Sequence, residues 1–139
     1  LLDGHIVLSR SLAEEAHWPP IDVLQSLSRL QPHLVSKQVI EAVGLARQHL
    51  AEYRRHADLI SIGAYRAGSD PRVDAAIAMR EPLRNFLTQN ATESTSISES
   101  QTELLRLTQA RPVNPVASQA GPGEPVNAAT ASTSQRSGV

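Results

Sequence analysis

The chain has 139 residues, a formal net charge of −1, 40% hydrophobic residues, 3% aromatic residues and no cysteine. This length allows one domain at most, and the near-neutral charge gives no electrostatic footprint for nucleic acid or an anionic membrane. The lack of cysteine excludes disulfides, thiolate metal sites and thiol nucleophiles. No apolar run approaches the ~20 residues that a membrane-spanning helix needs.

The start of the chain is apolar rather than polar. The first residue is Leu1, the only methionine is Met79, and the run HIVLS follows almost at once. Chain starts are usually polar and loosely held, because unanchored ends fray. We therefore expect this chain to be a piece of a longer protein.

The first predicted elements are a strand and a short helix. The run HIVLS is apolar and follows an Asp-Gly pair, which predicts a short buried strand. Ser11 is followed three residues later by Glu14, a spacing typical of a capping box. We therefore expect a helix over LAEEA that begins at Ser11.

Prolines then interrupt the chain. Pro19 and Pro20 should end the first helix and impose an extended path, and Pro32 should do the same further on. Arg29 lies between these prolines, in the stretch WPPIDVLQSLSRLQPHLV. The sequence thus predicts that Arg29 sits in a short loop whose backbone has few alternatives.

Residues 36–90 are predicted to be helical. Ser36 is a candidate N-cap and Gly63 a candidate C-cap of a long helix. The opposite, charged face of this helix, which includes Arg47, should face solvent. Apolar residues that recur at intervals of three and four predict its buried face: Val39, Val43, Ala46, Leu50, Tyr53, Ala57 and Ile60.

A turn and a second helix come next. The stretch AYRAGSDP is rich in residues that favour a break. Asp70 can cap the next helix with Pro71 in its first turn, and Pro82 should kink or loosen that helix. Its apolar face is predicted from Val73, Ala76, Ile77, Leu83 and Leu87.

Residues 91–139 are predicted to be a disordered tail. All four aromatic residues lie before residue 87, and Ser, Thr, Pro, Gly, Ala and Asn dominate the last part of the chain. Such a composition buries too little apolar area to offset chain ordering, which costs ~1–2 kcal/mol per residue. The stretch SESQTELLRLTQ is expected to form at most a transient helix, so deleting residues 91–139 should barely change the thermal midpoint.

The sequence lacks the common catalytic signatures. It has no HExxH, no close metal-ligand spacing among its histidines and no GxSxG. It also has no GxxxxGK[ST], the loop whose backbone N–H groups hold nucleotide phosphates. We expect no metal site, and the chain alone should not bind and cleave ATP by that route.

Two long stretches together resemble one family. LDGHIVLSRSLAEEAHWPPIDVLQSLSRL is similar to the end of the catalytic domain in flagellar and type III secretion ATPases, relatives of the F-type ATP synthase catalytic subunit. The similarity continues through LVSKQVIEAVGLARQHLAEYRRHADLISIGAYRAGSDPRVDAAI and covers about residues 2–88. The segment GAYRAGSDP resembles the export ATPases rather than F- or V-type synthase subunits.

The resemblance implies a domain organisation for a mainly α chain. Residues 1–35 would be the last strand, helix and finger loop of a RecA-like α/β nucleotide-binding domain. Residues 36–90 would be the C-terminal helical domain of the family. Residues 91–139 are not covered by the resemblance and stay a disordered Ser/Thr/Pro/Ala-rich tail.

The resemblance also implies roles for single residues. Arg29 in SLSR matches the family's arginine finger, which enters the nucleotide site of a neighbouring subunit; from spacing alone it is equally a surface arginine or half of an ion pair. Trp18 matches a tyrosine that stacks on adenine, and otherwise it is a core or edge tryptophan. Tyr65 is a candidate second wall of that pocket, or it packs the turn. Asp22 and Ser28 could position the loop.

The implied function is ATP hydrolysis that energises type III or flagellar protein export. The resemblance implies a ring hexamer, a coiled-coil stalk protein, secretion substrates and chaperones as partners, with no nucleic acid. It implies a cytoplasmic position at the base of the export apparatus, at the inner membrane, and membrane association only through that apparatus. ATP with Mg²⁺ would bind mainly to a missing N-terminal part, so the isolated chain is expected to carry no cofactor and to be inactive. The alternative is a non-catalytic interaction fragment that binds a stalk protein or intact ATPase subunits.

Overall fold

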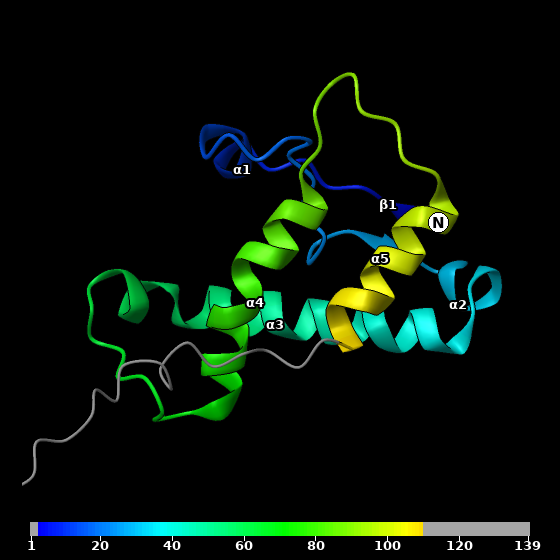
Figure 1. The fold of residues 1–139 in the computed structure, drawn as a ribbon. Helices are drawn as coiled ribbons and strands as arrows, with labels where there is room; N and C mark the ends of the chain where they lie inside the picture. Colours follow the sequence, from blue (N-terminus) through cyan, green and yellow to red (C-terminus); the bar gives the residue numbers. More distant parts are fainter. Residues whose placement is uncertain (1–2, 110–139) are drawn as a thin grey trace, which may run out of the picture.

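Helices dominate the structure, a computed structural model that describes residues 3–109. Two long helices cross near the middle of the molecule, and a shorter third helix lies beside the second (Figure 1). The mainly helical prediction is therefore confirmed. The elements in chain order are β1 (Gly4–His5), α1 (Arg10–Glu14), β2 (Leu27–Ser28), α2 (Gln31–Leu34), α3 (Lys37–Ser61), α4 (Pro71–Leu87) and α5 (Ile97–Gln109).

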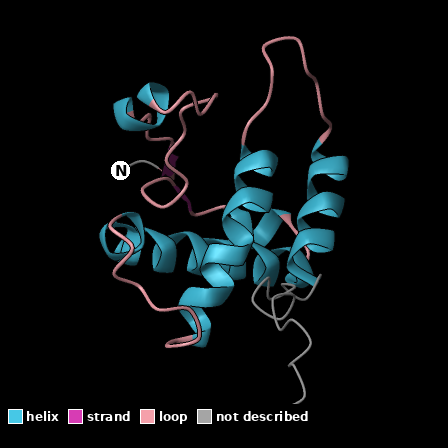
Figure 2. Cartoon of the chain, turned by 60° about the vertical axis from the view of Figure 1, so that its left-hand side comes forward, coloured by secondary structure: helices cyan, strands magenta, loops and turns pink. Residues whose placement is uncertain are grey.

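The core lies where α4 and α5 pack against α3. These two helices run side by side, joined by a long loop at one end, with α3 crossing them at the other (Figure 2). Leu83 and Val73 of α4 are 1% exposed, which makes them the most fully buried large side chains described. The central cluster consists of Ala42, Ala46, Met79, Leu83 and Leu104.

The ends of the long helices match their predicted signals. Ser36 is the N-cap of α3, and Gly63 follows its last turn with a φ of +71°, a conformation that favours glycine. Asp70 caps α4 through its side chain, and Pro71 begins that helix. Pro82 does not interrupt α4, which is assigned as continuous helix over 17 residues.

Helix α5 contradicts the predicted tail. Ile97–Gln109 forms a helix of 13 residues, and its Leu104 is 8% exposed and belongs to the core cluster. The prediction that this stretch is at most transient is wrong, because Leu104 and Leu105 find apolar partners on α3 and α4 that composition alone does not reveal. The rest of the predicted tail, residues 110–139, lies outside the described residues.

The N-terminal strand differs from its prediction. Only Gly4 and His5 form β1, which pairs antiparallel with Leu27–Ser28 of β2. Ile6 and Leu8 are 72% and 69% exposed, so the expectation of a buried strand is wrong within the described residues. A two-residue partner strand offers no apolar layer to cover HIVLS.

Helix α1 begins earlier than predicted. Its N-cap is Ser9, whose Oγ accepts a hydrogen bond from Leu12 N, and Ser11 lies inside the helix. The helix ends at Glu14, before Ala16, which has a φ of +56°. The predicted capping box is therefore wrong by two residues.

Helix α2 also corrects a prediction. Pro32 lies in the first turn of α2, where a missing N–H costs nothing, rather than extending the chain. Arg29 lies in the two-residue connection between β2 and α2.

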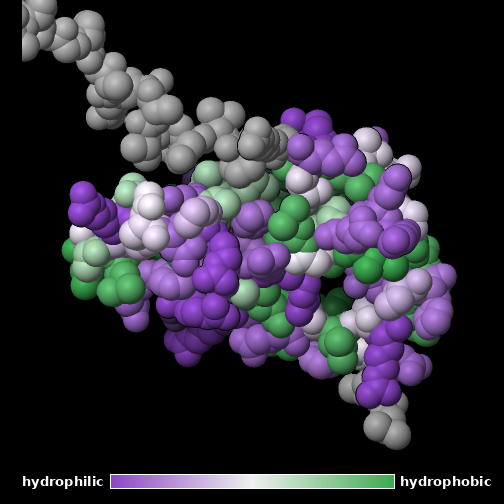
Figure 3. Space-filling view, turned by 90° about the horizontal axis from the view of Figure 1, so that it is seen from below, coloured by the Kyte–Doolittle hydropathy of each residue, from purple (hydrophilic) through white to green (hydrophobic). Residues whose placement is uncertain are grey.

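The face of the molecule that Figure 3 shows is largely hydrophilic, with apolar side chains in separate patches. Two apolar residues at the end of α3 are exposed: Leu59 at 47% and Ile62 at 74%. No helix within residues 3–109 combines the length and apolarity needed to cross a bilayer.

Candidate functional site

Arg29 is presented to solvent on a fixed stretch of backbone. Its side chain is exposed, and its backbone N–H donates to the Asp3 carbonyl at 2.8 Å, next to the β1–β2 pair. Within residues 3–109 its guanidinium makes no hydrogen bond or ion pair. A permanently charged planar fork that is not used inside the chain is available to bind an anion outside it.

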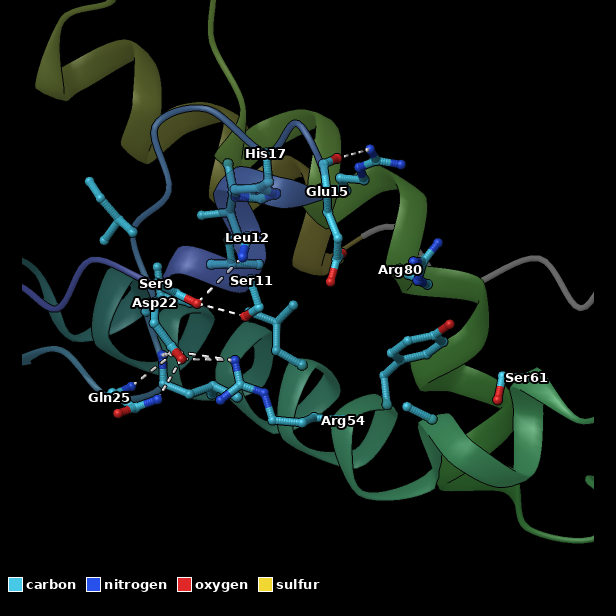
Figure 4. A pocket seen from close by; sticks show the side chains of 18 of the residues that line it. Ser9, Ser11, Leu12, Glu15, His17, Asp22, Gln25, Arg54, Ser61 and Arg80 are labelled. Carbon is cyan, nitrogen blue, oxygen red and sulfur yellow. Dashed lines mark hydrogen bonds and ion pairs between the residues drawn. The ribbon is translucent and has the colours of Figure 1, made fainter.

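The turn before Arg29 is organised around Asp22, which is 3% exposed. Its carboxylate accepts hydrogen bonds from Leu24 N at 3.0 Å, from Gln25 N at 3.2 Å and from Gln25 Nε2 at 2.8 Å. Arg54 of α3 reaches across to the same carboxylate, with Nη2 at 3.2 and 3.1 Å from its two oxygens (Figure 4). Asp22 therefore fixes both the local turn and its distance from α3.

These contacts set the charge state of Asp22. Burial by itself would raise the pKa of its carboxyl, but hydrogen bonds from Arg54 and from Gln25 outweigh burial and hold the pKa below its ordinary value of 3.8. Asp22 is therefore ionised at neutral pH and paired with the Arg54 guanidinium.

Arg47 binds the other side of the same turn. Its Nη1 donates to the Val23 carbonyl and, at 3.3 Å, to the Ser26 carbonyl, while Nη2 donates to the Leu24 carbonyl at 3.1 Å. The prediction that Arg47 faces solvent is therefore wrong. An arginine can bind several carbonyls at once because its donors lie in one rigid plane, and nothing in the apolar periodicity of α3 signals such a contact.

The turn is also tied to the N-terminal segment. Asp22 N donates to the Val7 carbonyl at 2.8 Å, and Val7 N donates to Ser26 Oγ at 3.0 Å. A Cβ at Gly4 would lie 2.7 Å from the Leu27 carbonyl oxygen, so β1 and β2 approach as closely as they do only because residue 4 is glycine.

A cavity of about 630 Å³ lies between the N-terminal segment, α3 and α4 (Figure 4). Its walls include Ser9, Glu15 and Arg54, together with Arg80, whose guanidinium lies 4.8 Å from the centre of the Tyr53 ring. Two of the arginines here have acidic partners: Arg54 pairs with Asp22, and Arg80 pairs with Glu81 at 2.8 Å. Arg84, which also lines the cavity, donates only to the Glu15 carbonyl, at 3.5 Å, within residues 3–109.

His17 forms part of the cavity wall. Its side chain is buried beside the end of α4. Burial and the nearby Arg84 lower the pKa of its imidazole below the ordinary 6.5, so His17 is neutral at physiological pH. A neutral imidazole adds no charge to the cavity.

Trp18 lies at a separate hollow near the end of α4. Its side chain is 56% exposed and lines a hollow of about 350 Å³ together with Arg84, Asn85, Thr88 and Gln89. Gln89 N donates to the Trp18 carbonyl at 2.8 Å, which fixes this part of the chain against the α4–α5 loop. The hollow, which Glu93 also lines, thus combines a large flat ring with amide, guanidinium and carboxylate groups.

Tyr65 lies elsewhere. Its hydroxyl donates to the Asp74 carboxylate at 2.9 Å in the first turn of α4, and Gly68 N donates to the same carboxylate. Trp18 lies beyond the other end of that helix of 17 residues, which spans ~25 Å at ~1.5 Å per residue. The structure therefore does not bring Tyr65 and Trp18 to one pocket, and Tyr65 packs the α3–α4 turn.

Two further features bear on cofactors and on what the sequence reveals. Among residues 3–109 no group of three His, Asp or Glu side chains is arranged to hold a metal ion. Sequence reasoning finds Asp22 as a loop-positioning residue but misses Arg47 and Arg54. Their separation of seven residues, which places both on one face of a helix, is the available signal.

Comparison with known proteins gives a consistent set of matches. The family model described as the T3SS EscN ATPase C-terminal domain matches residues 35–106. The chain is 49% identical over 108 residues to a flagellum-specific ATP synthase of Treponema pallidum (strain Nichols), covering 78% of this chain and 24% of that protein. The chain thus spans about a quarter of the length of this curated relative.

Solved structures match as well. The structure of the assembled ATPase EscN from the type III secretion system of enteropathogenic E. coli superposes with a TM-score of 0.74 at 37% identity, covering 77% of this chain and 26% of that one. The structure of assembled EscN in complex with its central stalk EscO gives a TM-score of 0.72 at the same identity and coverage.

Proposed function

The chain belongs to the family of the T3SS EscN ATPase C-terminal domain, and from this premise we propose that it is the C-terminal part of an ATPase that energises type III or flagellar protein export. The relatives that it matches are much longer, since the chain covers only 24% of the Treponema pallidum protein and 26% of EscN. The ATPase activity is therefore proposed for a longer protein, in which residues 1–35 end the nucleotide-binding domain and the later helices form the C-terminal domain.

Arg29 acts in this protein as an arginine finger that enters the nucleotide site of a neighbouring subunit. The observation that carries this role is its exposed guanidinium, not used within residues 3–109, on backbone held by Asp3 and by the turn at Asp22. Such a group stabilises the charge that develops on the transferring phosphoryl oxygens, without reorganising when the reaction occurs. A finger contributes roughly 10³–10⁵ in rate.

The test is Arg29→Ala in the full-length protein. ATP turnover should fall by roughly 10³- to 10⁵-fold, while binding of a non-hydrolysable ATP analogue stays within about twofold, because the finger acts on the transition state. Arg55→Ala is the matched control: this arginine is exposed on α3, and the ion pair that it makes within residues 3–109 is with Glu52, at 3.0 Å. Equal turnover in the parent and the Arg29 variant would refute the finger.

Trp18 forms one wall of the adenine pocket, and the end of α4 with the α4–α5 loop forms the other. The hollow of about 350 Å³ that Trp18 shares with Thr88 and Gln89 supports this assignment, and it replaces Tyr65 as the second wall. The chain has no GxxxxGK[ST] segment, so the phosphates and Mg²⁺ would be held by another part of the longer protein.

Trp18 is the only tryptophan of the chain, which gives a direct assay. In a full-length protein without other tryptophans, nucleotide should quench its fluorescence. Trp18→Ala should weaken nucleotide binding by about 5- to 150-fold, the equivalent of ~1–3 kcal/mol of base stacking, and Trp18→Tyr should restore it. Tyr65→Phe should leave binding unchanged. The opposite pattern would assign the adenine wall to Tyr65.

The proposed partners are further copies of the protein in a ring hexamer, a coiled-coil stalk, and secretion substrates with their chaperones, in the cytoplasm at the base of the export apparatus. The likeness to an assembled ATPase and to its complex with a central stalk supports the first two. Leu59 and Ile62, exposed where α3 ends, supply an apolar contact for the stalk. Replacing both with serine should weaken stalk binding in a pull-down and leave basal ATP turnover intact.

A further inference from the structure

Two arginines on one face of α3 hold the turn that precedes Arg29. Arg47 and Arg54 are seven residues apart, about two helical turns, so their side chains leave the helix in the same direction. Both reach residues 22–26, Arg54 through the Asp22 carboxylate and Arg47 through backbone carbonyls. We call Asp22, Arg47 and Arg54 the α3 latch.

The chemistry of the latch makes it selective for arginine. The Val23, Leu24 and Ser26 carbonyls converge on the single guanidinium of Arg47, and hydrogen bonds from a charged donor are stronger than neutral ones. A lysine carries the same charge but lacks the rigid planar fork. The Asp22 carboxylate is 3% exposed and would stay buried without its charged partner if Arg54 were removed.

Hydrogen bonds and strand pairing connect the α3 latch to the backbone of Arg29. From Ser26 the chain passes directly into β2, whose two residues pair with β1, and Arg29 N then donates to the Asp3 carbonyl. Val7 is bonded to both Asp22 and Ser26. Each residue from Ser26 to Arg29 is thus held by a hydrogen bond or a strand pairing. A shift of the Arg47 guanidinium should therefore also shift the backbone of Arg29.

We propose that Arg47, with the Asp22–Arg54 ion pair, is a positioning residue that transmits the placement of α3 to the Arg29 guanidinium. This inference rests on the proposed function, because it concerns how the finger is aimed. Arg47 touches no reacting atom and acts only through Arg29. In this way the helical body built from α3, α4 and α5 sets the rate of phosphoryl transfer at the neighbouring subunit.

The test uses Arg47→Ala and Arg47→Lys in the full-length protein, with Arg55→Ala as the matched control on the same helix. Misplacing a catalytic group by about 1 Å costs about 10²-fold in rate. Both Arg47 variants should therefore lower kcat by about 10- to 100-fold and leave the KM for ATP within about twofold. The Arg55 variant should match the parent in both constants.

A double-mutant cycle separates aiming from plain stability. If Arg47 acts through Arg29, the Arg47→Ala/Arg29→Ala protein should turn over ATP no more slowly than Arg29→Ala alone, because residues that act as a unit are not additive. Additive losses would overturn the inference, as would equal losses in the Arg47 and Arg55 variants. Wild-type turnover by Arg47→Lys would overturn the requirement for a planar fork.

Hydrogen exchange tests whether Arg47 holds the turn, independently of whether Arg29 is an arginine finger. In Arg47→Ala the amides of Leu24 and Arg29 should exchange faster, while those in the middle of α4 should be unchanged. If Arg29→Ala keeps full turnover, the finger is refuted, and the exchange result alone then decides whether α3 holds the turn. Unchanged exchange at both loop amides would overturn the latch whatever the turnover.

Discussion

Replacing Leu104 with alanine should destabilise the chain strongly, although composition assigns this residue to a disordered tail. Leu104 is 8% exposed and packs with Ala42, Ala46, Met79 and Leu83 in the core cluster. The change removes three buried carbons at ~0.8 kcal/mol each and leaves a cavity, so the free energy of unfolding should fall by about 3 kcal/mol. At ~4–8 °C per kcal/mol for a domain of this size, the thermal midpoint should fall by about 12–24 °C.

Thermal unfolding followed by circular dichroism measures this effect, and Ile97→Ala is the matched control. Ile97 begins the same helix but is 79% exposed, so its replacement should change stability by less than about 0.5 kcal/mol. Leu83→Ala, at a position 1% exposed in α4, gives the reference for a full core loss. If Leu104→Ala behaves like Ile97→Ala, α5 does not pack in solution and the tail begins where its composition suggests.

Two more predictions concern the turn before Arg29. The pKa of Asp22 is lower in the folded than in the unfolded chain, so ionised Asp22 stabilises the fold fully above about pH 5, and this stabilisation is lost as the pH falls through the folded pKa. Urea unfolding of the parent and of Asp22→Asn should therefore show a difference in unfolding free energy that is constant at neutral pH and shrinks in acid. A difference that stays unchanged in acid would contradict the ion pair. Gly4→Ala places a Cβ 2.7 Å from the Leu27 carbonyl oxygen, so it should speed exchange of the Arg29 amide, whereas Gly44→Ala, with open space around it, should not.

The two long helices are predictable because their signals are local. Ser36 and Asp70 are side-chain caps, Gly63 takes a positive φ, and apolar residues recur at the helical period. These features act within a few residues of one another, so the chain carries them whatever its tertiary context. Helix α5 fails the same reasoning because it depends on partners about sixty residues earlier in the chain, such as Ala42 and Ala46.

The residues of the candidate site also differ in how far the sequence predicts them. Arg29 and Trp18 are candidates that the sequence supplies through the family resemblance, and Asp22 is a candidate through its place near them. The sequence does not predict the contacts of Arg47 because its partners are backbone carbonyls 21 to 24 residues away. Every residue has a backbone carbonyl, so the residue types do not show which ones an arginine binds. The exposed Ile6 reverses the expectation of burial because apolar character predicts a buried strand only where a second layer exists to cover it.

The turn that Tyr65, Gly68 and Asp74 close with their hydrogen bonds gives α3 a stiff far end. From Arg47 to that end the helix runs for 14 residues, since it finishes at Ser61, or ~21 Å at ~1.5 Å per residue. Arg54 lies within this stretch and binds the Asp22 carboxylate, so α3 contacts residues 22–26 at two points along its axis. A tilt of α3 by about 5° about Arg47 would move the end of the helix by about 2 Å and Arg54, seven residues from Arg47, by about 1 Å. A contact made at the end of α3 would therefore also shift the Arg54–Asp22 pair.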